Sequence, residues 1–117
     1  MWFDFSANTN QRVFEEALKK IGAGRLMFGT DLPIARMRMK RVVENGKYIN
    51  LVQKGYYGDV SGDPHMREIE GAEAESLSFF TYEIIAAMRR ACESAEVSRA
   101  DVGAMFFGNA ARLFGIL

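Results

Sequence analysis

Apolar positions in the first quarter of the chain predict a strand, a helix and a second strand. Residues 2–5, Trp-Phe-Asp-Phe, form an aromatic-rich run typical of a short buried strand. From Gln11 to Ile21, apolar residues recur at spacings of one, three and four, with charged residues between them, as in an amphipathic helix. Residues 25–28, Arg-Leu-Met-Phe, form another short apolar run. A helix between two buried strands predicts a parallel βαβ crossover.

The middle of the chain, residues 34–75, lacks such a sustained pattern. Five glycines interrupt it, and only brief apolar runs such as residues 48–52 lie between them. A one-turn helix is expected within residues 34–44. Because a long connection without regular structure is unusual in a compact domain, the sequence predicts an irregular insertion or lid here.

Helical periodicity returns in the last third of the chain. Apolar residues between positions 77 and 91 fall on one stripe, and Ser76 is placed to cap the helix that they predict. Ser98 lies three residues before Asp101, an arrangement typical of a capping box, so a further helix is expected there. Asn109 is expected to cap a last short helix. The pattern as a whole predicts an α/β fold in a single domain, residues 1–117.

Composition narrows the range of partners. The chain has 117 residues, with 15 basic and 15 acidic side chains. A formal net charge of zero gives no bulk attraction to nucleic acid or to an anionic membrane, so neither is expected as a partner. No run of about 18 apolar residues is present. Cys92 is the only cysteine and has no disulfide partner within the chain, which predicts a cytoplasmic location.

The residues that follow the second predicted strand are the main candidates for chemistry. Positions 29–33 read Gly-Thr-Asp-Leu-Pro. Active sites of parallel α/β proteins form at the carboxyl ends of the strands, so the Asp31 carboxylate is placed where catalysis is built. Asp and Pro are also ordinary turn residues, and a tight turn or a helix cap explains the same segment.

Three segments together resemble the C-terminal part of the amidohydrolase-related (β/α)8 barrels. These segments are Phe-Asp-Phe-Ser at residues 3–6, Arg-Leu-Met-Phe-Gly-Thr-Asp-Leu-Pro at residues 25–33, and Phe-Phe-Gly-Asn-Ala-Ala-Arg-Leu-Phe-Gly at residues 106–115. The resemblance implies a partial TIM barrel that comprises the last two βα units and the closing helices. A full barrel takes roughly 250 residues, so this chain cannot close one alone.

The resemblance also implies a chemistry. In that family the aspartate at the end of the eighth strand, here Asp31, binds a catalytic divalent metal such as zinc and handles protons. The activities of this family include hydrolysis and decarboxylation of small organic substrates. The remaining metal ligands are histidines from earlier strands, which this chain lacks, and His65 lies at no corresponding position. The chain is therefore expected to be incomplete and inactive alone, and to need a missing barrel segment or copies of itself as a partner.

A basic run at residues 36–41, Arg-Met-Arg-Met-Lys-Arg, is the other local feature. Arg36 and Arg38 are candidates for binding a substrate carboxylate, because a guanidinium group can contact both carboxylate oxygens. The same alternation is also typical of a solvated face. Two other functions stay open, namely a non-catalytic ligand-binding module and an oligomerisation module.

Overall fold

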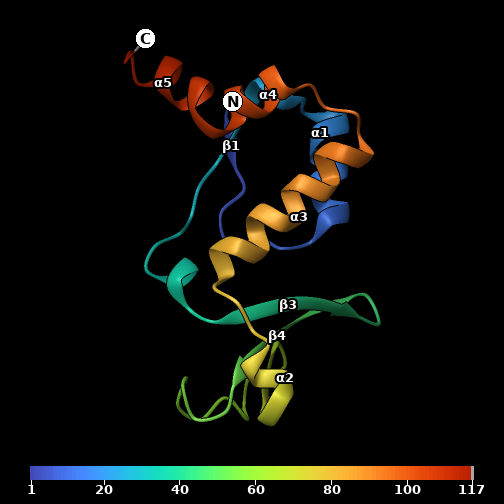
Figure 1. Cartoon of the computed structure of the whole chain (residues 1–117), viewed down its shortest axis with the longest axis vertical. Coiled ribbons are helices and arrows are strands. Elements are labelled where there is room, and N and C mark those ends of the chain that lie inside the picture. The colour runs from blue at the N-terminus through green and yellow to red at the C-terminus, as the bar shows by residue number, and fades with distance from the viewer. Residues whose placement is uncertain (117) are drawn as a thin grey trace.

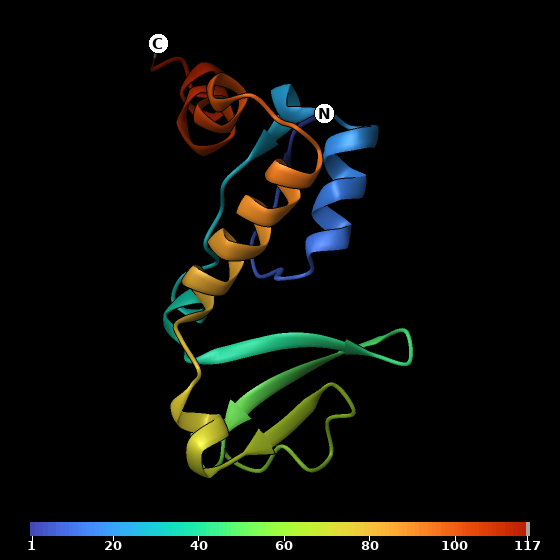
Figure 2. The same ribbon diagram turned by 45° about the vertical axis from the view of Figure 1, so that its right-hand side comes forward.

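The computed structural model describes residues 1–116, which form two parts lying one above the other (Figure 1). Helices surround a two-stranded sheet in the upper part, and a three-stranded sheet with one short helix forms the lower part (Figure 2). The radius of gyration is 15.6 Å, against about 13 Å for a compact domain of this length. The protein is a mixed α/β molecule of elongated shape, and its described residues form no closed barrel.

The upper sheet is the parallel βαβ unit that the sequence predicts. Strand β1 (Phe3–Asp4) pairs in parallel with β2 (Leu26–Met27), and α1 (Gln11–Lys20) and the 3-10 helix η1 (Ala23–Arg25) connect them. Asn10 caps α1 by accepting a backbone hydrogen bond of 3.1 Å in the first turn. Each strand has only two residues, so the order of the elements is confirmed while a partial TIM barrel is not.

The C-terminal helices follow one another without a break. Ser98 caps α4 (Arg99–Gly103), as expected, and α4 continues through the π-helical segment η3 (Ala104–Gly108) into α5 (Asn109–Leu113). The last short helix is present and α5 begins at Asn109, but the prediction that the Asn109 side chain caps it is wrong. Its backbone is already helical, and its side chain is fully buried, where it makes contacts outside the helix.

These contacts cover the outer edge of β2. The Asn109 side chain donates hydrogen bonds to the carbonyl oxygens of Ala23, at 2.8 Å, and Leu26, at 2.7 Å. The backbone N–H of Phe28 donates to the Met105 carbonyl at 2.8 Å. Because alternate residues of a strand direct their backbone groups to opposite sides, these bonds use the side of β2 that faces away from β1. The outer edge of β2 is therefore partly covered.

The long helix α3 (Phe80–Ser94) begins later than the sequence predicts. Ser76 ends the short helix α2 (Gly71–Glu75) instead of starting α3. Between them the chain is extended, because Phe79 forms a bridge with Arg38 and the Phe80 N–H donates to the Met37 carbonyl at 2.8 Å. Tertiary contact with the lower sheet thus overrides the local capping signal.

Residues 34–75 contain more regular structure than the expected irregular insertion. One helical turn, η2 (Ile34–Arg36), lies where it was expected, three strands follow, and an irregular loop remains at residues 54–65. Strand β3 (Met39–Glu44) pairs antiparallel with β4 (Lys47–Gln53), which pairs in parallel with β5 (Met66–Ile69). The β3–β4 turn is Asn-Gly at residues 45–46, with φ of 51° and 77°, as in a type I′ hairpin.

One apolar core joins the two parts. Met39 and Val52, on one face of the lower sheet, belong to the same buried cluster as Phe14 of α1 and Phe80 of α3. The opposite face of the sheet packs on α2 in a much smaller cluster. Its buried members are Ile69, Ala74 and Leu77. Within residues 1–116, no helix is both long enough and apolar enough to cross a membrane.

Candidate functional site

Polar side chains gather where β1 and β2 end. Asp4 accepts hydrogen bonds from the hydroxyl and the backbone N–H of Ser6, and these bonds lower the pKa of the Asp4 carboxyl. Gly29, just after β2, lies against the same pair. A Cβ at this position would collide with the Ser6 hydroxyl and come within 3.2 Å of an Asp4 oxygen. The two strand ends therefore converge only because residue 29 has no side chain.

Asp31 lies two residues beyond Gly29, and its side chain is exposed. Its φ of 54° is in the left-handed region, and its carbonyl accepts a hydrogen bond from the Ala35 N–H at 3.3 Å. No side-chain hydrogen bond joins its carboxylate to the described residues. Asp31 thus forms part of the turn into η2, in agreement with the tight turn that the sequence also allowed. Its carboxylate remains available to a ligand.

Arg36 and Arg38 have different environments. The Arg36 side chain is exposed, and it lines a cavity of about 310 Å³ together with Thr30 and Leu32, the two neighbours of Asp31. Arg38 instead donates from Nε to the Leu77 carbonyl at 2.9 Å and from a terminal nitrogen to the Glu75 carbonyl at 3.0 Å. Two of its donors are therefore used within the fold, which favours a structural role for Arg38.

The described residues do not form a metal site on their own. No group of three or more His, Cys, Asp or Glu side chains in residues 1–116 is arranged to hold a metal ion. The His65 ring stacks on Tyr48 in the lower sheet, with ring centroids 4.1 Å apart, and its Nδ1 lies 2.8 Å from the Tyr48 carbonyl. His65 is therefore engaged with the lower sheet.

Sequence reasoning missed Arg41, the last residue of the basic run. Its Nε donates to the Asn50 side chain at 2.9 Å, and a terminal nitrogen donates to the carbonyl of Ala7, just past the end of β1, at 2.7 Å. The guanidinium carbon lies 4.7 Å from the centroid of the Tyr48 ring. The signal that was available is the Asn-Gly turn, because it fixes the hairpin and places Arg41 opposite Asn50.

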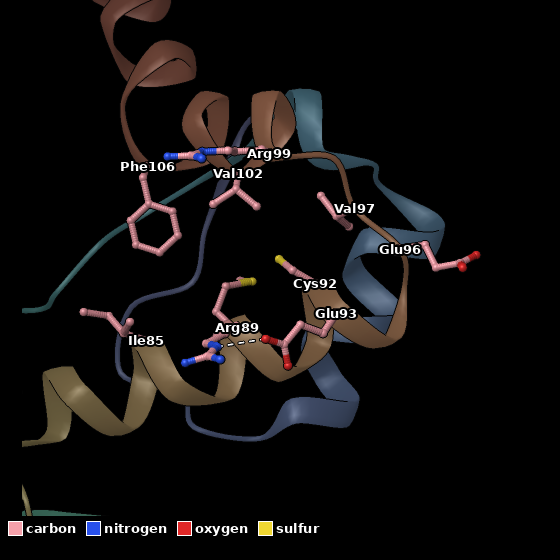
Figure 3. Close-up of a pocket in the computed structure, with 10 residues that line it drawn as sticks. Ile85, Arg89, Cys92, Glu93, Glu96, Val97, Arg99, Val102 and Phe106 are labelled. Atoms are coloured by element: carbon pink, nitrogen blue, oxygen red, sulfur yellow. Dashed lines mark hydrogen bonds and ion pairs between the residues drawn. The ribbon is translucent and has the colours of Figure 1, made fainter.

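A separate cavity of about 530 Å³ lies between α3 and the C-terminal helices. Cys92, Val102 and Phe106 point into it, while Arg89 and Glu93 form an ion pair of 2.8 Å at its rim (Figure 3). Burial, aided by the Glu93 carboxylate, raises the pKa of the Cys92 thiol, which makes it a poor nucleophile. The lining is mainly apolar, and none of the predicted site residues belongs to it.

The polar groups at the strand ends are thus the part of the molecule best suited to chemistry, although they are incomplete as a catalytic site. Asp4, Ser6 and Asp31 provide two carboxylates and a hydroxyl with no histidine among them, and the chain neighbours of Asp31 line a cavity. Comparisons of the chain with protein-family models, with curated proteins and with solved structures find no match.

Proposed function

We propose that this chain is one segment of a larger metal-dependent hydrolase or decarboxylase of the amidohydrolase type, to which it contributes Asp31. The observation that carries the proposal is that Asp4, Ser6 and Gly29 meet at the carboxyl ends of two parallel strands, with Asp31 two residues farther along the chain. In α/β proteins this end of the sheet is where ligands and catalytic groups assemble.

Metal binding requires ligands from a partner in addition to Asp31 of this chain. Asp31 offers one carboxylate, whereas a catalytic zinc site ordinarily takes three protein ligands. Since residues 1–116 contain no such group, the donor set of the isolated chain does not fit a bound metal. The proposal therefore assigns the remaining ligands, and with them the activity, to strands outside this chain.

The two edges of the upper sheet differ in whether their backbone groups are available to pair with an added strand. The outer side of β2 is hydrogen-bonded to Met105 and Asn109. On the outer side of β1, the Asp4 backbone groups have no partner in a strand of the described sheet, so an incoming strand can pair there directly. A strand can pair with the outer side of β2 only if the Phe28 N–H gives up its hydrogen bond to the Met105 carbonyl.

Zinc titration and light scattering across a dilution series test the proposal. The isolated chain is expected to self-associate and to bind zinc without fixed stoichiometry. After assembly with a polypeptide that supplies the missing strands, it is expected to bind zinc stoichiometrically. Asp31→Asn should abolish that binding and turnover, whereas Asp63→Asn, which changes an exposed aspartate of the lower part, should leave both unchanged. Full turnover in the Asp31 variant would refute the catalytic assignment.

An oligomerisation module is the second candidate, because the C-terminal end is unusually apolar. Phe107, Phe114 and Ile116 are 62%, 72% and 71% exposed, which is more than scattered surface apolar residues explain. On this view Phe114→Asp would yield monomers, and Asp31→Asn would change nothing. If both the oligomer and the assembled zinc site survive Phe114→Asp, this candidate fails.

A further inference from the structure

The Arg41 guanidinium has an unusual environment for a cation. It lies between two aromatic rings, with its central carbon 4.7 Å from the Tyr48 centroid and 5.6 Å from the Phe80 centroid. Phe80 is fully buried, so one side of the group rests on the apolar core. Burial lowers the pKa of the Arg41 guanidinium below its usual value. The cation is partly desolvated but remains charged at neutral pH.

No carboxylate of the described residues neutralises this charge. The four ion pairs in residues 1–116 involve other cations, and the partners of Arg41 are neutral oxygens of Asn50 and Ala7. A charge withdrawn from water is stabilised far more by an anion than by a carbonyl or an amide. The site therefore has a positive charge that the fold does not compensate.

Three N–H groups of Arg41 have no partner among the described residues. A guanidinium carries five donors, and the hydrogen bonds to Asn50 and Ala7 use two of them. Every buried side-chain nitrogen or oxygen in residues 1–116 has a hydrogen-bond partner. The terminal nitrogen of Arg41 that has no partner must therefore reach solvent, where a dissolved anion can approach its two N–H groups.

The lower sheet holds this group in a fixed position. Tyr48 lies on the same face of the sheet as Asn50, two residues along β4, and Asn50 is directly opposite Arg41 on β3. His65 stacks on Tyr48, at an interplanar angle of 15°. Since β4 is the central strand, Arg41, Tyr48 and His65 form one stacked row across the sheet. Such support lowers the entropy that ordering the guanidinium would cost on binding.

We propose that Arg41 forms a binding site for the carboxylate of a small organic anion, next to the loop that leaves β1. The ligand carboxylate accepts hydrogen bonds from the free guanidinium donors, and the exposed part of Tyr48 provides apolar contact for the rest of the ligand. This site needs neither a metal nor a partner strand, so it stands independently of the proposed hydrolase or decarboxylase function.

A purely structural role would explain only part of these contacts. Arg41 does connect the two parts of the molecule, since its side chain binds the Ala7 carbonyl and its own carbonyl accepts from the Thr9 hydroxyl at 3.2 Å. That connection uses one side-chain donor and the backbone. The contact of the guanidinium with the Phe80 ring of α3 adds to it. The terminal nitrogen without a partner contributes nothing to this connection.

NMR titration of the full chain with benzoate tests the site, observing the Arg41 Nε signal. A saturable shift with a millimolar dissociation constant is expected, and benzamide, which has the same ring without the charge, should cause none. Arg41→Gln should weaken binding at least tenfold, while Arg12→Gln, the matched control at an exposed arginine of α1, should leave it unchanged.

Three results would overturn the proposal: no saturable shift at Arg41 Nε, an equal shift with benzamide, or unchanged benzoate affinity in a folded Arg41→Gln variant. If that variant does not fold, the comparison of benzoate with benzamide at the wild-type Arg41 signal decides alone. Loss of zinc binding or of turnover in the assembled protein would not affect this outcome, because the titration contains no metal.

Discussion

The two parts of the molecule are stabilised in different ways. In the upper part, aromatic rings pack on one another, with Phe5 against Phe14 at 5.5 Å and Phe28 stacked on Phe106 at 4.7 Å between centroids. The small cluster under the lower sheet has only three buried residues. Part of the contact between the sheet and its surroundings is polar, through Arg38 to the Glu75 and Leu77 carbonyls and through Arg41 to the Ala7 carbonyl.

This difference indicates which part opens first. Apolar burial contributes free energy in proportion to area, while a hydrogen bond contributes little net free energy because water offers the same partners to the open form. Regions with few buried apolar contacts open at lower free energy than the core. The lower sheet, which carries Arg41, is therefore expected to open at lower free energy than the upper part.

The largest expected effect is a difference in stability loss between substitutions in the main core and in the small cluster. Phe14→Ala removes a buried ring from the main core and is expected to lower the free energy of unfolding by about 3–5 kcal/mol. Leu77→Ala, in the small cluster, should cost only about 2 kcal/mol, since its surroundings can collapse on the space. Urea denaturation measures both. Equal losses would show that the two parts are stabilised alike.

A smaller effect is expected at the polar connections. Arg38→Ala removes two hydrogen bonds to the carbonyls of Glu75 and Leu77 and should cost about 1–2 kcal/mol. Arg36→Ala, two residues away on an exposed side chain, should have no measurable effect on stability. Amide hydrogen exchange should show faster opening of β3 to β5 in the Arg38 variant only. Equal protection in both variants would argue that Arg38 does not hold the sheet.

The smallest effect concerns an ion pair within the lower sheet. Arg67 binds Glu44 through two hydrogen bonds, which lower the pKa of the Glu44 carboxyl below its ordinary 4.5. A carboxyl whose pKa is lowered by folding stabilises the protein above its unfolded pKa, and this contribution is lost as pH falls through the folded pKa. Wild type should therefore exceed Glu44→Gln slightly in melting temperature at pH 7, and the difference should vanish below about pH 4. A difference that persists at pH 3 would exclude this pair as its source.

The sequence predicted the upper part well and the lower part poorly, for a physical reason. Helices α1 and α3 bury a continuous stripe, so their period is visible over many residues. Strands β3 to β5 are short and carry charged residues such as Arg41 on a partly buried face, which hides the alternation expected of a strand. Only Asn45 and Gly46 signalled the hairpin locally.

The candidate site was predictable only in part. Asp31 follows a buried strand directly, so its place at the strand end could be inferred. That Asp4 and Ser6 would meet Gly29 depends on the parallel pairing of strands separated by a helix, which sequence spacing does not fix. Arg38 and Arg41 read alike in the basic run, and each uses two side-chain donors within the fold. Arg41 also lies over the rings of Tyr48 and Phe80, contacts that sequence spacing does not fix.

The hydrogen bond from Asn109 to Leu26 has a consequence for biosynthesis. The two residues are 83 positions apart. At about 5–20 residues per second, ribosomes make β2 roughly 4–17 seconds before the side chain that covers its outer edge. During that interval the nascent chain carries an uncovered strand edge beside the aromatic residues of the future core. Chaperone binding to the emerging chain should therefore persist until the C-terminal helices leave the ribosome.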